Sequence, residues 1–244
     1  MKAIFKRELS SYFKSPLGYI FLGLFVAYAS LMFLFSTVPY QTSDMRNYFI
    51  SVCYIFVLAV PLITMKMFSE ERKQKTDQLW LTAPVKVSSV VIGKFLSAFS
   101  VLAIGVLATL IFLVFLALYG NPAVIQSLVG YVGILLYGAM LISMGMFISS
   151  LTQNQIISAV ITLAAIGIFS IVPTMGIDFL GLFNGAFSFV GTALNGILSF
   201  IDINARFYDF AKGTLNIVPL VYFISITALF NLLTVCVIER RRWR

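Results

Sequence analysis

The residues of this chain that could take part in chemistry are few and are not spaced for catalysis. Histidine is absent, which removes the commonest metal ligand and general base. The single Gly-Lys pair, Gly93-Lys94, is followed by Phe95 and has Ser88 where the first glycine of a phosphate-binding loop would stand. We therefore expect no catalytic residue, no metal and no cofactor in the chain itself.

The cysteines and the charges near the end of the chain lead to the same interpretation. Cys53 and Cys236 lie in separate apolar runs that we expect near opposite membrane faces. Each is interpreted as a small core hydrophobe rather than as half of a disulfide. Asp202 and Arg206 stand four residues apart, which is typical of a pair on a helix surface and not of a catalytic dyad.

The elements that carry these residues are expected to be membrane-spanning helices. Of the 244 residues, 60% are hydrophobic and 11% charged, and the mean hydropathy is +1.00, far from the composition of a soluble domain. The predicted fold is a single all-α integral membrane domain over residues 1–244 with six transmembrane helices. The candidate spans are 17–38, 48–68, 92–118, 128–149, 156–174 and 216–238.

The basic residues predict the orientation of these six spans. Six spans leave only Arg46, Arg206 and Lys212 of the 17 basic residues on the outer side, as the positive-inside rule favours. Both termini are therefore expected in the cytoplasm. The net charge of +8 is then a consequence of topology, and no nucleic-acid partner is expected; the bilayer itself is the predicted partner of this surface.

The uncharged run at 179–201 is long enough to be a seventh span. A seventh span would move the basic C-terminal segment, Arg240 to Arg244, to the outside. The run is also rich in glycine and contains Asn184 and Asn195, which suits a broken, partly inserted structure. We predict an external helical hairpin over 175–215, between spans five and six.

An amphipathic helix is predicted before the first span, over residues 1–16. Its apolar face carries Phe5, Leu9, Tyr12 and Phe13, and lysines and an arginine occupy the other face. This pattern is typical of a helix that lies in the membrane interface. A simple anchor and a functional elbow remain equally open.

The cytoplasmic segment 69–90 is the most informative part of the sequence. It contains both charge signs and then presents Leu79 and Trp80, which a solvated linker would not favour. A short helix that offers these two side chains to a partner and is stopped by Pro84 is one interpretation. The alternative is that Trp80 only anchors the chain among the headgroups.

The order of these features resembles the ABC-2 type exporter permeases. The loop match runs from Phe68 to Lys94 and includes Glu70-Glu71-Arg72, Thr76, Leu79, Thr82, Pro84-Val85 and Gly93-Lys94. The C-terminal match resembles the branch with the permeases of gliding motility and of nitrous-oxide-reductase maturation. It consists of Ser199-Phe200, Phe207, Phe210, Gly213, Tyr222, Ser225, Leu233-Thr234 and Glu239 to Trp243.

Two positions depart from the pattern of these families. Lys75 stands where the loop usually has glycine before Thr76, and the histidine common between Phe200 and Phe207 is absent. The first departure bears on how the loop helix is formed. The second removes a polar group on the outer face, so no substrate is transferred from the branch.

The resemblance implies a permease subunit of an ATP-driven exporter in the bacterial cytoplasmic membrane. A coupling helix would dock on a cytoplasmic ABC ATPase dimer, which would bind ATP and Mg²⁺, and a second permease subunit, identical or different, would complete the pathway. An extracytoplasmic accessory membrane protein stays open. The residues implied in ATPase coupling are Glu70, Glu71, Arg72, Thr76, Leu79, Trp80 and Pro84.

Two other function classes remain as alternatives. A secondary transporter would normally place charged residues at mid-membrane, whereas the assigned spans have only Lys66 and Lys94, near their ends, where both could snorkel. A non-transporting membrane scaffold is the other alternative. Small polar residues such as Ser149 and Thr162 either line a pathway or only permit close packing.

Overall fold

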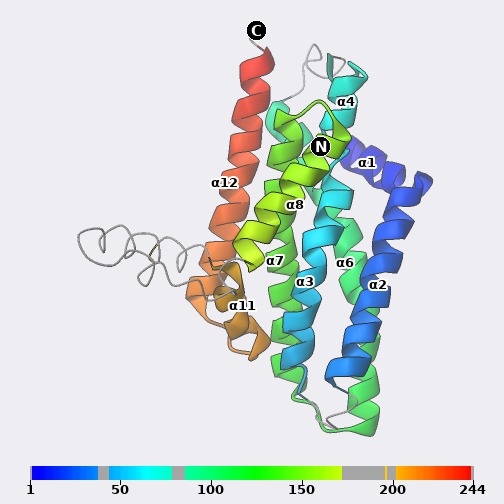
Figure 1. The fold of residues 1–244 in the computed structure, drawn as a ribbon, viewed down its shortest axis with the longest axis vertical. Coiled ribbons are helices and arrows are strands. Elements are labelled where there is room, and N and C mark those ends of the chain that lie inside the picture. The colour runs from blue at the N-terminus through cyan, green and yellow to red at the C-terminus, as the bar shows by residue number, and fades with distance from the viewer. Residues whose placement is uncertain (1, 38–43, 79–85, 172–195, 197–201, 243–244) are drawn as a thin grey trace.

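The computed structural model describes residues 2–37, 44–78, 86–171, 196 and 202–242. The regular elements within these ranges are helices that form an elongated bundle (Figure 1), in agreement with the predicted all-α class. Their bounds are α1 Lys2–Lys14, α2 Pro16–Ser36, α3 Arg46–Thr64, α4 Ser69–Lys73, α6 Val87–Tyr119, α7 Val124–Leu151, α8 Gln155–Ile171, α11 Ile203–Ala211 and α12 Ile217–Arg242.

Five helical segments of the described chain are long and apolar enough to cross a membrane, where six spans were predicted. They are α2, the stretch from α3 through α4, α6, α7 and α12. The fifth predicted span corresponds to α8, which has only 17 residues. At about 1.5 Å per residue, the described part of α8 is about 25 Å long, less than the hydrocarbon core of a typical bilayer.

Helices α8 and α11 follow one another along α7. The hydroxyl of Ser170, at the end of α8, lies 3.1 Å from that of Tyr137 near the middle of α7, and the Asn204 carboxamide in the first turn of α11 accepts from the same Tyr137 hydroxyl at 3.3 Å. Farther along, Phe210 packs on Gly133. By helical rise α8 and α11 together are about 39 Å long and α7 about 42 Å, so two short helices flank one long one.

The predicted external hairpin over 175–215 is only partly described by the structure. Residues 172–195 and 197–201 lie outside the described residues. The part that is described, α11, is packed within the bundle against α7, α3 and α12, with Phe207 and Phe210 buried. The hairpin is therefore not confirmed; the aromatic face of α11 fits against α7 at Gly133.

Helix α7 is the central element of the bundle. It contacts α3, α6, α8, α11 and α12 and is the most buried of the long helices. Glycines on its surface let neighbours approach closely: a Cβ at Gly130 would lie 2.3 Å from Phe49, and one at Gly145 would lie 2.4 Å from Thr64. Small residues at helix crossings are how membrane bundles gain van der Waals contact without a hydrophobic driving force.

The predicted amphipathic helix is present as α1, and it packs on protein. Phe5, Leu9 and Phe13 are half-buried, and Tyr12 is buried. The Tyr12 hydroxyl donates to the carbonyl of Ile63 in α3 at 3.1 Å. The apolar face of α1 therefore docks on the bundle, mainly on α6, in addition to any contact with lipid.

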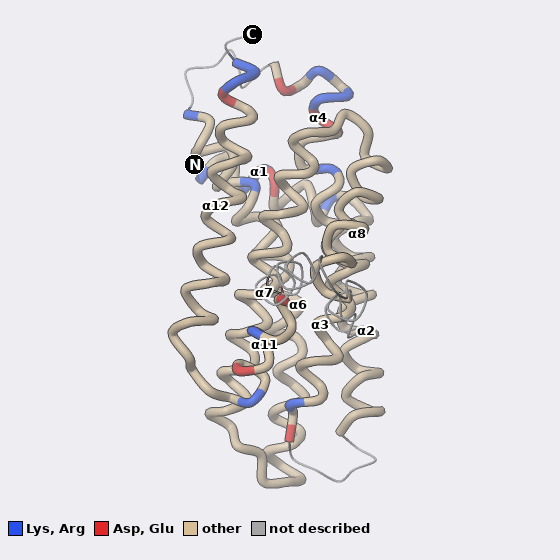
Figure 2. The backbone as a smooth tube through the Cα atoms, turned by 60° about the vertical axis from the view of Figure 1, so that its left-hand side comes forward, with Lys and Arg blue, Asp and Glu red and all other residues tan. Residues whose placement is uncertain are grey.

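Charged residues gather at one end of the bundle (Figure 2). This end, which we call the basal end, carries α1, α4 and the C-terminal end of α12, while the α6–α7 connection lies at the opposite, distal end (Figure 1). The two ends of the described chain thus lie at the same end of the bundle.

Helix α4 ends in a turn that requires a left-handed residue. Thr76 N–H bonds to Glu71 O at 2.9 Å and Lys75 N–H to Arg72 O at 3.3 Å, which is the pattern of a Schellman motif. Lys75 has φ of 56°, a conformation that glycine adopts without steric cost. Lysine in place of glycine therefore strains the backbone at position 75, at the end of α4.

We predict that Lys75→Gly stabilises this turn by about 1 kcal/mol, since it removes the left-handed penalty of a residue with a Cβ. The Thr76 amide should then exchange with deuterium about fivefold more slowly. Lys73→Gly, within α4, is the matched control and should speed exchange. Equal exchange rates of the Thr76 amide in Lys75→Gly and Lys73→Gly would contradict the assignment of a strained left-handed turn at Lys75.

Candidate functional site

The candidate site is a cluster of charges at the basal end, centred on Lys94. Lys94 lies near the start of α6 and is 1% exposed. Its ammonium lies 2.9 Å from a Glu71 carboxylate oxygen and 3.1 Å from one of Glu8, and 5.3 Å from the centre of the Phe68 ring. One buried cation thus joins α1, α4 and α6.

Arg7 completes the cluster. Its guanidinium lies 2.8 Å from the second oxygen of Glu8 and 3.5 Å from Glu71. Two cations therefore face two carboxylates, and this balance is what makes the burial of Lys94 tolerable. The Arg7 side chain is 64% exposed, so it covers the cluster on the solvent side while contributing less energy than Lys94.

Glu8 is held in its charged form by this arrangement. Burial alone would raise the pKa of Glu8, but the opposite charge of Lys94 and the hydrogen bonds from Arg7 and Lys94 outweigh it and lower the pKa. The pKa of Arg7 is raised, mainly by its hydrogen bond to Glu8. Both shifts favour the ionised pair in the folded protein.

A second set of hydrogen bonds fixes the start of α4 to the end of α7. The Ser149 hydroxyl accepts the backbone N–H groups of Phe68 and Ser69 at 3.2 and 3.3 Å, and it donates to the carbonyl of Met65 at 3.4 Å. Ser149 is fully buried. Of the two interpretations of such small polar residues, this contact supports packing and anchoring at Ser149 rather than a pathway lining.

Two arginines bind the carbonyls at the end of α7. Arg72 of α4 donates to the carbonyl of Leu151 at 3.0 Å, and Arg241 of α12 donates to that of Ser150. These carbonyls have no partner within α7 because they lie in its last turn. Arg72 and Arg241 therefore tie α4 and α12 to the same helix end.

A cavity of about 680 Å³ opens between α1 and α4. Lys94 and the two glutamates of the cluster line one side, and Lys66, Glu70 and Gln74 line another. The cavity is lined by charged, polar and apolar side chains together. The ion pairs of Glu71 with Lys94 and Arg7 join α4 to α6 and α1 beside this cavity.

The predicted coupling residues are only partly brought together. Glu71 and Arg72 make the contacts above. Glu70 lies 3.9 Å from Lys66, one turn earlier, and Thr76 is exposed at the end of α4. Leu79, Trp80 and Pro84 lie outside the described residues.

Sequence reasoning missed Glu8, Lys94 and Ser149. Lys94 was interpreted as snorkelling to the interface, because it stands near one end of an apolar run. No local signal identifies the cluster, because Glu8, Glu71 and Lys94 lie in three separate elements that only the fold brings together. Within the described ranges, no group of three or more Asp, Glu or Cys residues is placed to hold a metal ion.

A profile of ABC-2 family transporter proteins matches residues 55–242. This range is most of the chain, and it contains Glu71 and Lys94 as well as the long helices α6, α7 and α12. The chain belongs to the ABC-2 family of transporter proteins. No curated protein matches the sequence.

The family explains the main features of this ABC-2 chain. Its members are the multi-pass membrane components of ABC transporters, and they generally pair with an ATPase. The matched range begins within α3 and therefore includes the loop that carries α4. The gliding-motility and nitrous-oxide-reductase branch is not distinguished by this match.

We predict that Lys94→Met destabilises the ABC-2 chain by about 3 kcal/mol, because Glu8 and Glu71 would be left charged and without their buried cation. Lys66→Met is the matched control: its long pair with Glu70 is half-buried, at 3.9 Å, and should contribute less than about 1 kcal/mol. Thermal unfolding of both variants in detergent measures the difference. Similar losses in the two would show that the cluster has no special role.

The docking of α1 should weaken at acid pH. Because the pKa of Glu8 is lower in the folded chain than in the unfolded one, the cluster contributes its full stability above about pH 4.5 and loses it as the pH falls through the folded pKa. Wild type should therefore lose more thermal stability than Glu8→Gln between about pH 5 and pH 3. Parallel pH profiles would contradict this linkage.

Proposed function

We propose that the chain is the permease subunit of an ATP-driven exporter and that the Lys94 cluster transmits motion from a separate ATPase. Family membership supports the permease role. The observation that carries the coupling role is the burial of Lys94 between Glu8 of α1 and Glu71 of α4. A displacement of α4 is in this way delivered to both α1 and α6.

The strength of the cluster is adequate for this task. Separating one partner from a buried ion pair costs about 3–5 kcal/mol. A ligand that reverses a conformational equilibrium from 1:99 to 99:1 supplies about 5.5 kcal/mol of differential binding. The free energy needed to break the cluster is thus of the same order as the energy that nucleotide binding delivers, so breaking it would consume most of that energy and joint movement of α4 and α1 is favoured.

The partner proposed at the basal end is a cytoplasmic ABC ATPase dimer, with ATP and Mg²⁺ bound there. The segment that follows α4, with Thr76, Leu79 and Trp80, is the proposed docking helix, and Pro84 its end. A second permease subunit would face this one. An extracytoplasmic accessory membrane protein remains a further candidate partner.

We propose a bacterial cytoplasmic membrane location with both termini inside. The concentration of basic residues at the basal end (Figure 2) supports this orientation. Helices α8 and α11 are proposed to form the fifth of six crossings in two halves. Such a crossing takes the chain from the basal end of α7 to the distal start of α12, as the shared basal position of the two termini requires.

A secondary transporter remains the alternative, and one observation favours it. Asp202 caps α11 by accepting the Ala205 N–H at 2.9 Å, and its neighbour Asn204 binds Tyr137 near the middle of α7. A charged residue therefore lies close to mid-depth, where none was expected from the sequence. Charges at that depth are typical of ion-coupled transport.

We predict that Leu79→Ala with Trp80→Ala weakens association with the ATPase about tenfold or more, as loss of an apolar anchor does at interfaces. Trp243→Ala is the control and should leave binding unchanged. Copurification with the ATPase in mild detergent gives the affinity, and ATP hydrolysis after reconstitution gives the coupling. Lys94→Met should keep binding but lose the effect of substrate on hydrolysis.

One outcome would reject the proposal of an ATP-driven exporter. It is wild-type protein that copurifies with no ATPase and transports substrate in liposomes under an ion gradient alone. Loss of that transport in Asp202→Asn would then establish the alternative.

A further inference from the structure

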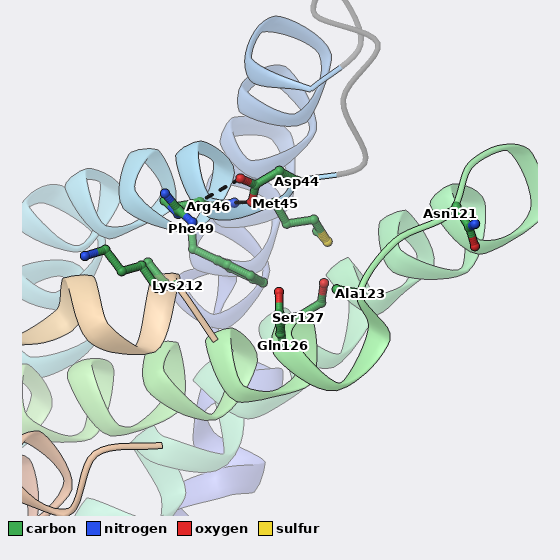
Figure 3. Close-up of a pocket in the computed structure, with 10 residues that line it drawn as sticks. Asp44, Met45, Arg46, Phe49, Asn121, Ala123, Gln126, Ser127 and Lys212 are labelled. Atoms are coloured by element: carbon green, nitrogen blue, oxygen red, sulfur yellow. Dashed lines mark hydrogen bonds and ion pairs between the residues drawn. The ribbon is translucent and has the colours of Figure 1, made fainter. Parts of the chain in front are cut away.

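A second cavity, the distal pocket, lies at the opposite end from the coupling cluster. It has a volume of about 300 Å³ and is formed where α3 begins, α7 begins and α11 ends (Figure 3). Its charged lining residues are Arg46, Lys212 and Asp44. Cations thus outnumber anions here, although the distal end has few basic residues.

The Arg46 guanidinium is largely unused by the protein. Its Nε lies 4.0 Å from Asp44, the limit of an ion pair, and is buried without a hydrogen bond within the described chain. Asp44 instead uses its other oxygen to accept the Arg46 backbone N–H at 2.9 Å. Because Asp44 is engaged in this way, most of the donor capacity of the Arg46 side chain is available for another acceptor.

Polar groups at the start of α7 line the same distal pocket. No described side chain caps the start of α7, which has Ala123 at its N-cap position, so the N–H groups of its first turn are available. Ser127 lines the pocket and is 5% exposed. An anion that entered the pocket would meet these donors together with the positive end of the α7 dipole.

Lys212 supplies a second, movable cation. Its ammonium lies 4.2 Å from the centre of the Tyr208 ring, and the residue is exposed. A flexible ammonium over an aromatic ring is held weakly. It can therefore turn toward an anion in the pocket at little cost.

The surroundings of the pocket are apolar. Ile125, beside the pocket residue Gln126, is 80% exposed, and Leu215, close after Lys212, is 64% exposed. The pocket lies where helices α3 and α7 begin, which is the headgroup level for membrane-spanning helices. A ligand with a phosphate at this level and an acyl chain along these side chains would fit both the cationic pocket and the apolar surface beside it.

We propose that the distal pocket binds a phosphate group, held by Arg46, Lys212 and the first turn of α7. The phosphate belongs either to the headgroup of an anionic lipid or to a soluble phosphate-bearing molecule. The site is independent of the coupling cluster and of which energy source drives transport.

The test is native mass spectrometry of the purified full chain with phosphatidylglycerol, phosphatidylcholine or inorganic phosphate. Wild type should bind phosphatidylglycerol at least about tenfold more tightly than Arg46→Gln/Lys212→Gln, and more tightly than it binds phosphatidylcholine. The matched control is Arg206→Gln, whose cation lies over Tyr222 away from the pocket, and it should retain binding. Arg46→Lys/Lys212→Arg keeps both charges and should rescue most of the affinity.

Competition between phosphatidylglycerol and inorganic phosphate distinguishes a lipid headgroup from a soluble phosphate-bearing molecule. Displacement of phosphatidylglycerol by inorganic phosphate would assign the site to soluble phosphate compounds, and resistance to displacement would assign it to a lipid headgroup. Equal binding of phosphatidylglycerol to wild type and to Arg46→Gln/Lys212→Gln would overturn the proposal. If that variant does not fold, Lys212→Gln alone, at an exposed residue, must still weaken binding for the proposal to stand.

Discussion

Lys94 imposes the constraint on which the basal end of this protein depends. A lysine that is 1% exposed must either lose its charge or keep its counter-charges in place. The chain keeps them in place, with one carboxylate from α1 and one from α4. Neither element can leave α6 without exposing an uncompensated charge, so three segments far apart in sequence behave as one unit.

Helix α7 holds the rest of the bundle together. Its glycines admit α3 and α11, and its final turn receives Arg72 from α4 and Arg241 from α12. Ser149, in that turn, holds the backbone that leads into α4. Movement of α4 is consequently resisted by α7 and shared with α1, which is the mechanical property that a transmission element needs.

The sequence was sufficient to locate the long helices, because apolar runs bounded by charges and by Gly-Pro turns are local signals. It also identified position 75 as unusual, and the left-handed φ of Lys75 gives the reason. It could not identify the Lys94 cluster, since the pairing of α1 with α6 is a tertiary contact. The packing of α11 could not be predicted either, because it depends on the fit of Phe210 against Gly133, two residues far apart in the sequence.

The most direct test of the account is a distance measurement between α1 and α4 during the ATPase cycle. Spin labels at Lys6 and Lys73, both exposed, report this distance by pulsed electron resonance in the complex with the ATPase. The account predicts that it stays constant with and without ATP, while the distance between the Lys73 labels of two facing permease subunits changes. A Lys6–Lys73 distance that changes by several ångströms on ATP binding, with the cluster intact in sequence, would contradict transmission through Lys94.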